Sequence, residues 1–150
     1  MSKAQQNQLS DYPISIPIDT RWHDNDIYGH VNNVVYYSYF DSLVNRFLIE
    51  HAGLDIHHGQ QIGLMVSSQC NYFDSVAFPD ALIGGLRVTR LGNSSVEYDL
   101  AIFKQGQQSA SAQGRLTHVF VDRHTQKPKA IEGRLRETLQ SIMIQTDAEQ

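Results

Sequence analysis

The sequence has a single cysteine and no long apolar run. Cys70 has no second cysteine to pair with, which excludes a disulfide within the chain and suits a reducing compartment. No apolar run approaches the roughly 20 residues that a membrane-spanning helix needs. The polar start, residues 1–11, lacks the apolar core of a signal peptide. These absences predict a cytoplasmic protein without membrane insertion.

The chain also lacks a strong positive charge. Its formal net charge is −4 at pH 7, whereas a nucleic-acid binder needs a basic face that neutralises phosphates. We therefore expect no nucleic-acid partner. The sequence contains no Gly-x-Ser-x-Gly motif, and this absence argues against a serine hydrolase, which that motif defines.

What is present is typical of one globular domain, with 41% hydrophobic and 19% charged residues in a length of 150. We expect loose polar ends at residues 1–11 and 146–150. Apolar and polar residues alternate over residues 14–22, the period of a half-buried strand. Pro17 cannot donate to a neighbouring strand, so this strand should lie at an edge or be bulged.

The period changes at Asn33, where a broad apolar stripe begins. It predicts a helix from Asn33 to about Ala52 that is covered on several sides. Asn32 or Asn33 can cap its start, and Gly53 can end it. The stripe consists of Tyr36, Tyr39, Phe40, Leu43, Val44, Phe47 and Leu48.

Four strand-like runs follow a polar loop at residues 55–61, and a short amphipathic helix is expected at residues 131–143. Small residues on the last strand would let a helix approach the sheet closely. The order of elements indicates an α+β fold, in which an antiparallel sheet of about five strands wraps around one long helix. The expected faces are Leu64, Val66, Ser68, Cys70 and Tyr72; Leu82, Gly84, Leu86 and Val88; Val96, Tyr98, Leu100 and Ile102; and Ala110, Ala112, Gly114, Leu116, His118 and Phe120.

The segment from Arg21 to Asn33 gathers two carboxylates, two imidazoles and side-chain amides just before the long helix. A helix start offers unsatisfied N–H groups and the positive end of the helix dipole. A carboxylate beside donors that can hold an oxyanion is suited to acyl transfer. Asp24 and Asp26 are both candidates for this chemistry, although bonds to nearby backbone N–H groups would account for Asp24.

This segment resembles the signature of hotdog-fold acyl-CoA thioesterases of the 4-hydroxybenzoyl-CoA thioesterase type. The resemblance extends over residues 13–140. It rests on Asp24-Asn25-Asp26-Ile27-Tyr28-Gly29-His30-Val31-Asn32-Asn33 with Tyr36 and Asp41, supported by Phe78-Pro79-Asp80, Leu91-Gly92-Asn93-Ser94-Ser95 and residues 114–121.

The resemblance implies hydrolysis of thioesters of coenzyme A or acyl carrier protein, without metal or cofactor, by a homodimer or homotetramer with active sites at subunit interfaces. It implies that Asp26 is the nucleophile or general base and that the backbone N–H of Asn33 holds the oxyanion. His30 would support the site, with Tyr28 and Gly29 shaping it. Plant-type acyl-carrier-protein thioesterases share the pattern Asp-x-x-x-His-Val-Asn-Asn, but Tyr28 stands where they use an Asn.

Other polar residues are candidates for substrate binding. Ser68 and Asn71 could reach a pocket across a dimer interface. Arg90, Asn93 and Ser94 lie at the turn where the resemblance implies contact with the nucleotide phosphates of coenzyme A. Only Arg90 is basic there, which departs from the basic cluster of the 4-hydroxybenzoyl-CoA enzyme.

Two other functions remain compatible with this fold. One is a non-hydrolytic acyl-thioester binding protein, although such a protein needs no carboxylate like Asp26 beside the thioester carbonyl. The other is a dehydratase, which would be expected to carry a different His-bearing helix motif. A metal site formed by His23, Asp24, Asp26 and His30 is conceivable, but the spacing fits no familiar ligand pattern.

Overall fold

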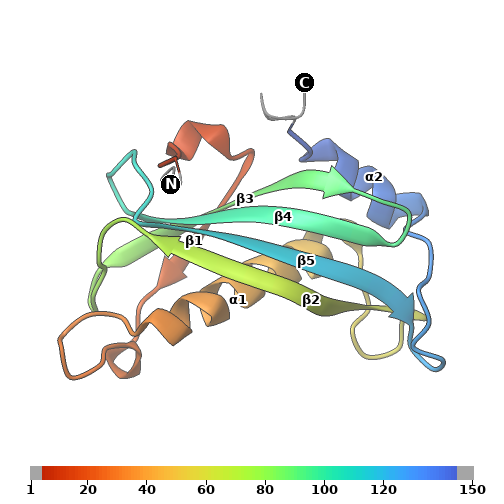
Figure 1. The fold of residues 1–150 in the computed structure, drawn as a ribbon, viewed down its shortest axis with the longest axis horizontal. Coiled ribbons are helices and arrows are strands. Elements are labelled where there is room, and N and C mark those ends of the chain that lie inside the picture. Colours follow the sequence, from red (N-terminus) through yellow and green to blue (C-terminus); the bar gives the residue numbers. More distant parts are fainter. Residues whose placement is uncertain (1–4, 145–150) are drawn as a thin grey trace.

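One antiparallel sheet and one long helix on its face make up most of the fold (Figure 1). The computed structural model describes residues 5–144. The strands have the order β1-β3-β4-β5-β2, so that β1 and β2 are the edges. This is the predicted α+β hotdog arrangement. The elements are β1 (Ile14–Asp19), α1 (Asn33–Ala52), β2 (Gln61–Tyr72), β3 (Ala81–Leu91), β4 (Ser95–Lys104), β5 (Ala112–Asp122) and α2 (Gly133–Ser141), with 3-10 turns at Leu9–Asp11 and Trp22–Asp24.

The central helix α1 begins and ends where the sequence predicts. The Asn32 side chain accepts a hydrogen bond from the N–H of Val34 at 3.0 Å and so caps the start. Gly53 ends the helix with φ +69°, a left-handed conformation that glycine adopts without steric cost. Every residue of the predicted apolar stripe is buried. None of the helices within residues 5–144 is long and apolar enough to cross a membrane.

The sheet approaches α1 most closely at two glycines. A Cβ added at Gly114 would lie 2.5 Å from the Phe40 ring, and one added at Gly84 would lie 2.9 Å from Leu43. Both distances are too short for a real side chain. The expectation that small residues on the last strand permit close packing is therefore confirmed.

The edge strand β2 departs from the predicted alternation. Its register with β5 shifts at Val66, the extra residue of a β-bulge. Leu64 consequently faces away from α1, whereas Cys70 opposes Gly114 and faces α1. The prediction that Leu64 and Cys70 share a face is wrong, because one extra residue inverts the alternation of side chains.

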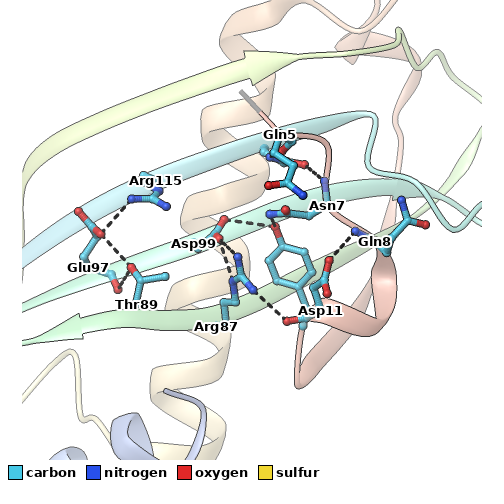
Figure 2. Close-up of polar contacts among 11 residues, drawn as sticks. Gln5, Asn7, Gln8, Asp11, Arg87, Thr89, Glu97, Asp99 and Arg115 are labelled. Atoms are coloured by element: carbon cyan, nitrogen blue, oxygen red, sulfur yellow. Dashed lines mark hydrogen bonds and ion pairs between the residues drawn. The ribbon is translucent and has the colours of Figure 1, made fainter. Parts of the chain in front are cut away.

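The sheet face away from α1 carries a buried polar network (Figure 2). Arg87 and Asp99 form an ion pair at 2.7 Å, and their side chains are only 11% and 4% exposed. The Tyr12 hydroxyl donates to Asp99 at 3.2 Å, and the Arg87 guanidinium lies 5.0 Å from the centre of the Tyr12 ring. Burial raises the pKa of Asp99, and the attraction of Arg87 offsets only part of that effect.

Residues 5–11, expected to be loose, are hydrogen-bonded to this region of the sheet. The Asn7 N–H donates to the Gln113 side chain, and the Asn7 carbonyl accepts from the Ala110 N–H at 3.0 Å. The segment thus lies over β4 and β5, on the opposite side from α1 (Figures 1 and 2). The expected loose end at residues 146–150 lies outside the described residues.

Candidate active site

The loop between β1 and α1 folds back on itself. The Asp26 N–H donates to the His30 carbonyl, and the Gly29 N–H donates to the Asp26 carbonyl, both at 3.0 Å. Gly29 has φ +82°, which side-chain-bearing residues rarely adopt. The Val31 N–H donates to the Val76 carbonyl at 2.8 Å, which ties the loop to the segment after β2. These bonds fix the path of the backbone into α1.

Asp24 is the buried acid of this loop, with 1% exposure. Its carboxylate accepts hydrogen bonds from the Tyr39 hydroxyl at 2.7 Å, the Arg21 N–H at 2.9 Å and the Arg21 guanidinium at 3.1 and 3.2 Å. Burial alone would raise the pKa of Asp24, but the bonds from Tyr39 and Arg21 outweigh it and lower the pKa. A carboxylate so fully engaged fits the structural role expected of Asp24.

Asp26 is half-buried and lies against the helix start. One carboxylate oxygen accepts from the Tyr28 N–H at 2.9 Å, and the other faces the Asn32 side-chain amide nitrogen at 3.4 Å. The same Asn32 side chain accepts from the Val34 N–H at 3.0 Å. Asn32 thereby links the candidate carboxylate to the first turn of α1.

The cap leaves one backbone donor free. The Asn32 N–H donates to the Asp24 carbonyl, the Val34 N–H to the Asn32 side chain, and the Val35 N–H to the Asn32 carbonyl. No hydrogen bond within residues 5–144 uses the Asn33 N–H. This donor lies at the positive end of the helix dipole, where an anion is stabilised.

An open hollow of about 310 Å³ lies at the same helix start. The Tyr72 hydroxyl donates to the Asn33 carbonyl at 3.1 Å, and the Tyr72 and Tyr36 rings meet edge to face with centroids 5.1 Å apart. Asp26 is next to the hollow through Asn32 but is not in its wall. The hollow is lined by Val31, Asn33, Tyr36, Tyr72, Phe73, Asp74 and Ser75.

The remaining predicted loop and strand residues lie on the surface of the chain. Tyr28 is 80% exposed, and Gly29 and His30 are also exposed. Ser68 and Asn71 are exposed on β2, with Ser68 on the α1 side and Asn71 on the other face. The single chain therefore places Asp26 against Asn32, the residue before Asn33, and leaves these five residues exposed.

The predicted nucleotide-binding residues lie at the opposite end of the sheet. Arg90 is exposed near the end of β3, and Asn93 and Ser94 form the turn into β4. That turn adjoins the last residues of β5, whereas Tyr72 opposes Ala112 at the first. Within the single chain, Arg90, Asn93 and Ser94 therefore lie away from the hollow.

Several residues of the hollow were not anticipated. Phe73, Asp74 and Ser75 follow β2, and the only sequence signal for them is a mixed aromatic and polar run at a strand end. Tyr36, predicted as part of the apolar stripe of α1, is 3% exposed and also lines the hollow.

The discounted metal site is not assembled in the described part of the chain. No group of three or more His, Cys, Asp or Glu side chains within it is arranged to hold a metal ion. Asp24 is instead committed to Arg21 and Tyr39.

Residues 20–139 match the Thioesterase-like superfamily, and the chain belongs to this superfamily. The match includes the loop of Asp26, all of α1 and the sheet from β2 to β5. A comparison with curated proteins finds no match.

Solved structures share the fold. The PA5185 protein from Pseudomonas aeruginosa strain PAO1 is 55% identical, with 93% of this chain and 97% of that chain covered and a TM-score of 0.91. A 1,4-dihydroxy-2-naphthoyl-CoA thioesterase from Synechocystis is 14% identical, with 85% and 96% covered and a TM-score of 0.77. A thioesterase from Thermus thermophilus, complexed with coenzyme A and Zn, is 23% identical, with 88% and 95% covered and a TM-score of 0.73.

Proposed function

We propose that this protein hydrolyses acyl thioesters of coenzyme A to a free acid and a thiol. The observation that carries the proposal is the Asn33 N–H at the start of α1, which no hydrogen bond within residues 5–144 uses. Asn33 lines the open hollow and follows Asn32, whose side chain faces the Asp26 carboxylate at 3.4 Å. Membership of the Thioesterase-like superfamily supports the reaction class. The coenzyme A bound to the Thermus thermophilus thioesterase supports this choice of carrier over acyl carrier protein.

In the proposed mechanism the thiolate leaves with little need for protonation, so the enzyme requires chiefly a nucleophile or base and an oxyanion donor. Asp26 attacks the thioester carbonyl, expelling the thiolate and forming an anhydride that water then hydrolyses to the free acid, or it deprotonates a water that attacks the carbonyl and expels the thiolate directly. The Asn33 N–H and the positive end of α1 stabilise the oxyanion. The Asn32 amide holds the carboxylate oxygen of Asp26 that the Tyr28 N–H does not hold.

A second copy of the chain completes the site in this proposal. β2 is an edge strand, and Leu64, Met65 and Val66 on it are 38%, 41% and 60% exposed. A long edge with exposed apolar side chains favours pairing with another strand. A homodimer formed along β2 would cover this edge and place the partner's polar strand residues near the hollow, and a homotetramer would pair two such dimers.

Release of free thiol, followed with a thiol-trapping dye over short, medium, long and aromatic acyl-CoAs and an acyl carrier protein thioester, tests the function. Asp26→Asn should lower turnover at least about a hundredfold, because loss of a base or nucleophile typically costs that much. Asp19→Asn is the matched control, since Asp19 is an exposed aspartate at the end of β1. Both variants should unfold like the wild type.

Three outcomes separate the alternatives. Near-wild-type turnover by Asp26→Asn contradicts the role of Asp26 as nucleophile or base. A wild-type protein that binds acyl-CoA and releases no thiol is an acyl-thioester binding protein rather than a hydrolase. Faster turnover of the carrier-protein thioester than of any acyl-CoA identifies acyl carrier protein as the carrier.

A further inference from the structure

Tyr72 fastens the edge strand β2 to the first turn of α1 at two points. Its hydroxyl donates to the Asn33 carbonyl at 3.1 Å, across 39 positions of sequence. Its ring packs edge to face against Tyr36, which is 3% exposed and part of the core. Tyr72 itself is the last residue of β2 and is 45% exposed.

The first turn of a helix needs contacts from outside the helix, because its N–H groups have no partners within the helix and helix ends fray. Here the peptide group between Asn33 and Val34 is held from both sides. Its N–H donates to the Asn32 side chain, and its carbonyl accepts from the Tyr72 hydroxyl. Fixing this peptide group fixes the backbone at Asn33 and hence the direction of the adjacent Asn33 N–H.

The phenol is suited to remain a donor. Burial raises the pKa of Tyr72 well above its ordinary value of 10, so that the hydroxyl keeps its proton throughout the neutral range.

We infer that Tyr72 is a positioning residue whose hydroxyl orients the Asn33 N–H toward the developing oxyanion. This inference rests on the proposed function. An oxyanion donor acts through preorganisation, and a small misplacement lowers the rate of the chemical step. Loss of the hydroxyl should therefore reduce kcat rather than weaken substrate binding.

The test compares Tyr72→Phe, which removes only the hydroxyl, with Tyr98→Phe. Tyr98 is a matched control because its hydroxyl is buried without a hydrogen-bond partner among the described residues and lies outside the hollow. We expect Tyr72→Phe to lower kcat about tenfold with KM changed less than twofold and the same thermal unfolding temperature. Amide exchange of the Val34 N–H, measured by NMR without substrate, should become faster in Tyr72→Phe alone.

Each other result overturns the inference. An unchanged kcat in Tyr72→Phe shows that the hydroxyl does not position the donor. A raised KM with unchanged kcat shows that Tyr72 merely contacts substrate, and an equal loss in Tyr98→Phe shows a general loosening of the fold. The two proposals fail separately: a wild type without turnover removes the proposed function, whereas an enzyme sensitive to Asp26→Asn but not to Tyr72→Phe removes this inference alone.

Discussion

The Tyr39 hydroxyl donates a hydrogen bond to the Asp24 carboxylate at 2.7 Å and so joins the second turn of α1 to the loop of the candidate site. Both side chains are buried, with exposures of 6% and 1%. The two aspartates of the loop therefore have different environments, because Asp24 is enclosed by donors while Asp26 stays partly open to solvent.

Asp24→Asn should destabilise the fold by about 1–3 kcal/mol, since an amide nitrogen cannot accept the bonds that Tyr39 and Arg21 donate. Urea unfolding measures the loss, and thiol release measures turnover per folded molecule. Tyr39→Phe should cost less because it removes one bond. A larger loss of turnover in Asp24→Asn than in Asp26→Asn, with unchanged stability, would show that Asp24 rather than Asp26 is the catalytic carboxylate.

Asn32→Ser should keep the helix cap and lose the link to Asp26. Serine can still accept from the Val34 N–H, but its shorter side chain cannot also reach the Asp26 carboxylate. We expect kcat to fall about tenfold while the thermal unfolding temperature stays within a few degrees, the small change that exchange of one good cap for another produces. Asn45→Ser, an exposed change later in α1, is the control. Unchanged kcat in Asn32→Ser would contradict the prediction.

The stability of the wild type should fall as the pH falls from about 6.5 to 4. Burial lowers the pKa of His118 to about 4, so the unfolded chain binds a proton in this range while the folded protein does not. The resulting slope is at most about 1.4 kcal/mol per pH unit. Urea unfolding across this range should show a flatter profile in His118→Phe and an unchanged profile in His124→Gln, where the histidine is exposed. Parallel profiles in the wild type and His118→Phe would refute the assignment.

Arg87→Met should destabilise the fold by about 3–5 kcal/mol, because it leaves the Asp99 carboxylate buried without its cation. The double variant Arg87→Met/Asp99→Leu should recover much of this loss. Urea unfolding at one fixed protein concentration measures both effects. Turnover per folded molecule should stay unchanged, since the pair lies on the sheet face away from α1 (Figure 2). A double variant as unstable as Arg87→Met would contradict the prediction.

Val66→Glu should dissociate the proposed oligomer, since it places a charge on the exposed edge strand β2. Light scattering across a dilution series, paired with rate measurements, should show loss of specific activity together with loss of mass. Ile56→Glu is the control, because Ile56 is an exposed apolar residue in the loop before β2. A monomer with undiminished specific activity at low concentration would refute the shared active site.

The features that the sequence predicts well are those set by local forces. The bounds of α1 follow from its apolar period and from the caps at Asn32 and Gly53. The inward side of β5 follows from alternation, and Gly114 and His118 lie on it as expected. Pro17 indicates an edge strand, and β1 is one edge of the sheet.

The features that the sequence does not predict depend on contacts between residues that are far apart in the chain. The bulge at Val66 exists only in the pairing of β2 with β5, so the period of β2 alone cannot reveal it. The bond from Tyr72 to Asn33 joins residues that only the folded sheet brings together. The family resemblance, together with the place before a helix, indicates Asp26, and residue pattern alone does not separate it from Asp24.

Because Gly114 and Phe40 are in contact, the residue types tolerated at one of these positions depend on the residue at the other. The Phe40 ring fills the space that a side chain at position 114 would need. A larger side chain at either position therefore requires a smaller one at the other. Homologous chains with Ala or Ser at 114 should therefore carry a smaller residue at 40. Because Phe40 lies one helical turn beyond Tyr36, the same exchange offers a route by which selection could reshape the floor of the hollow without altering the loop of Asp26.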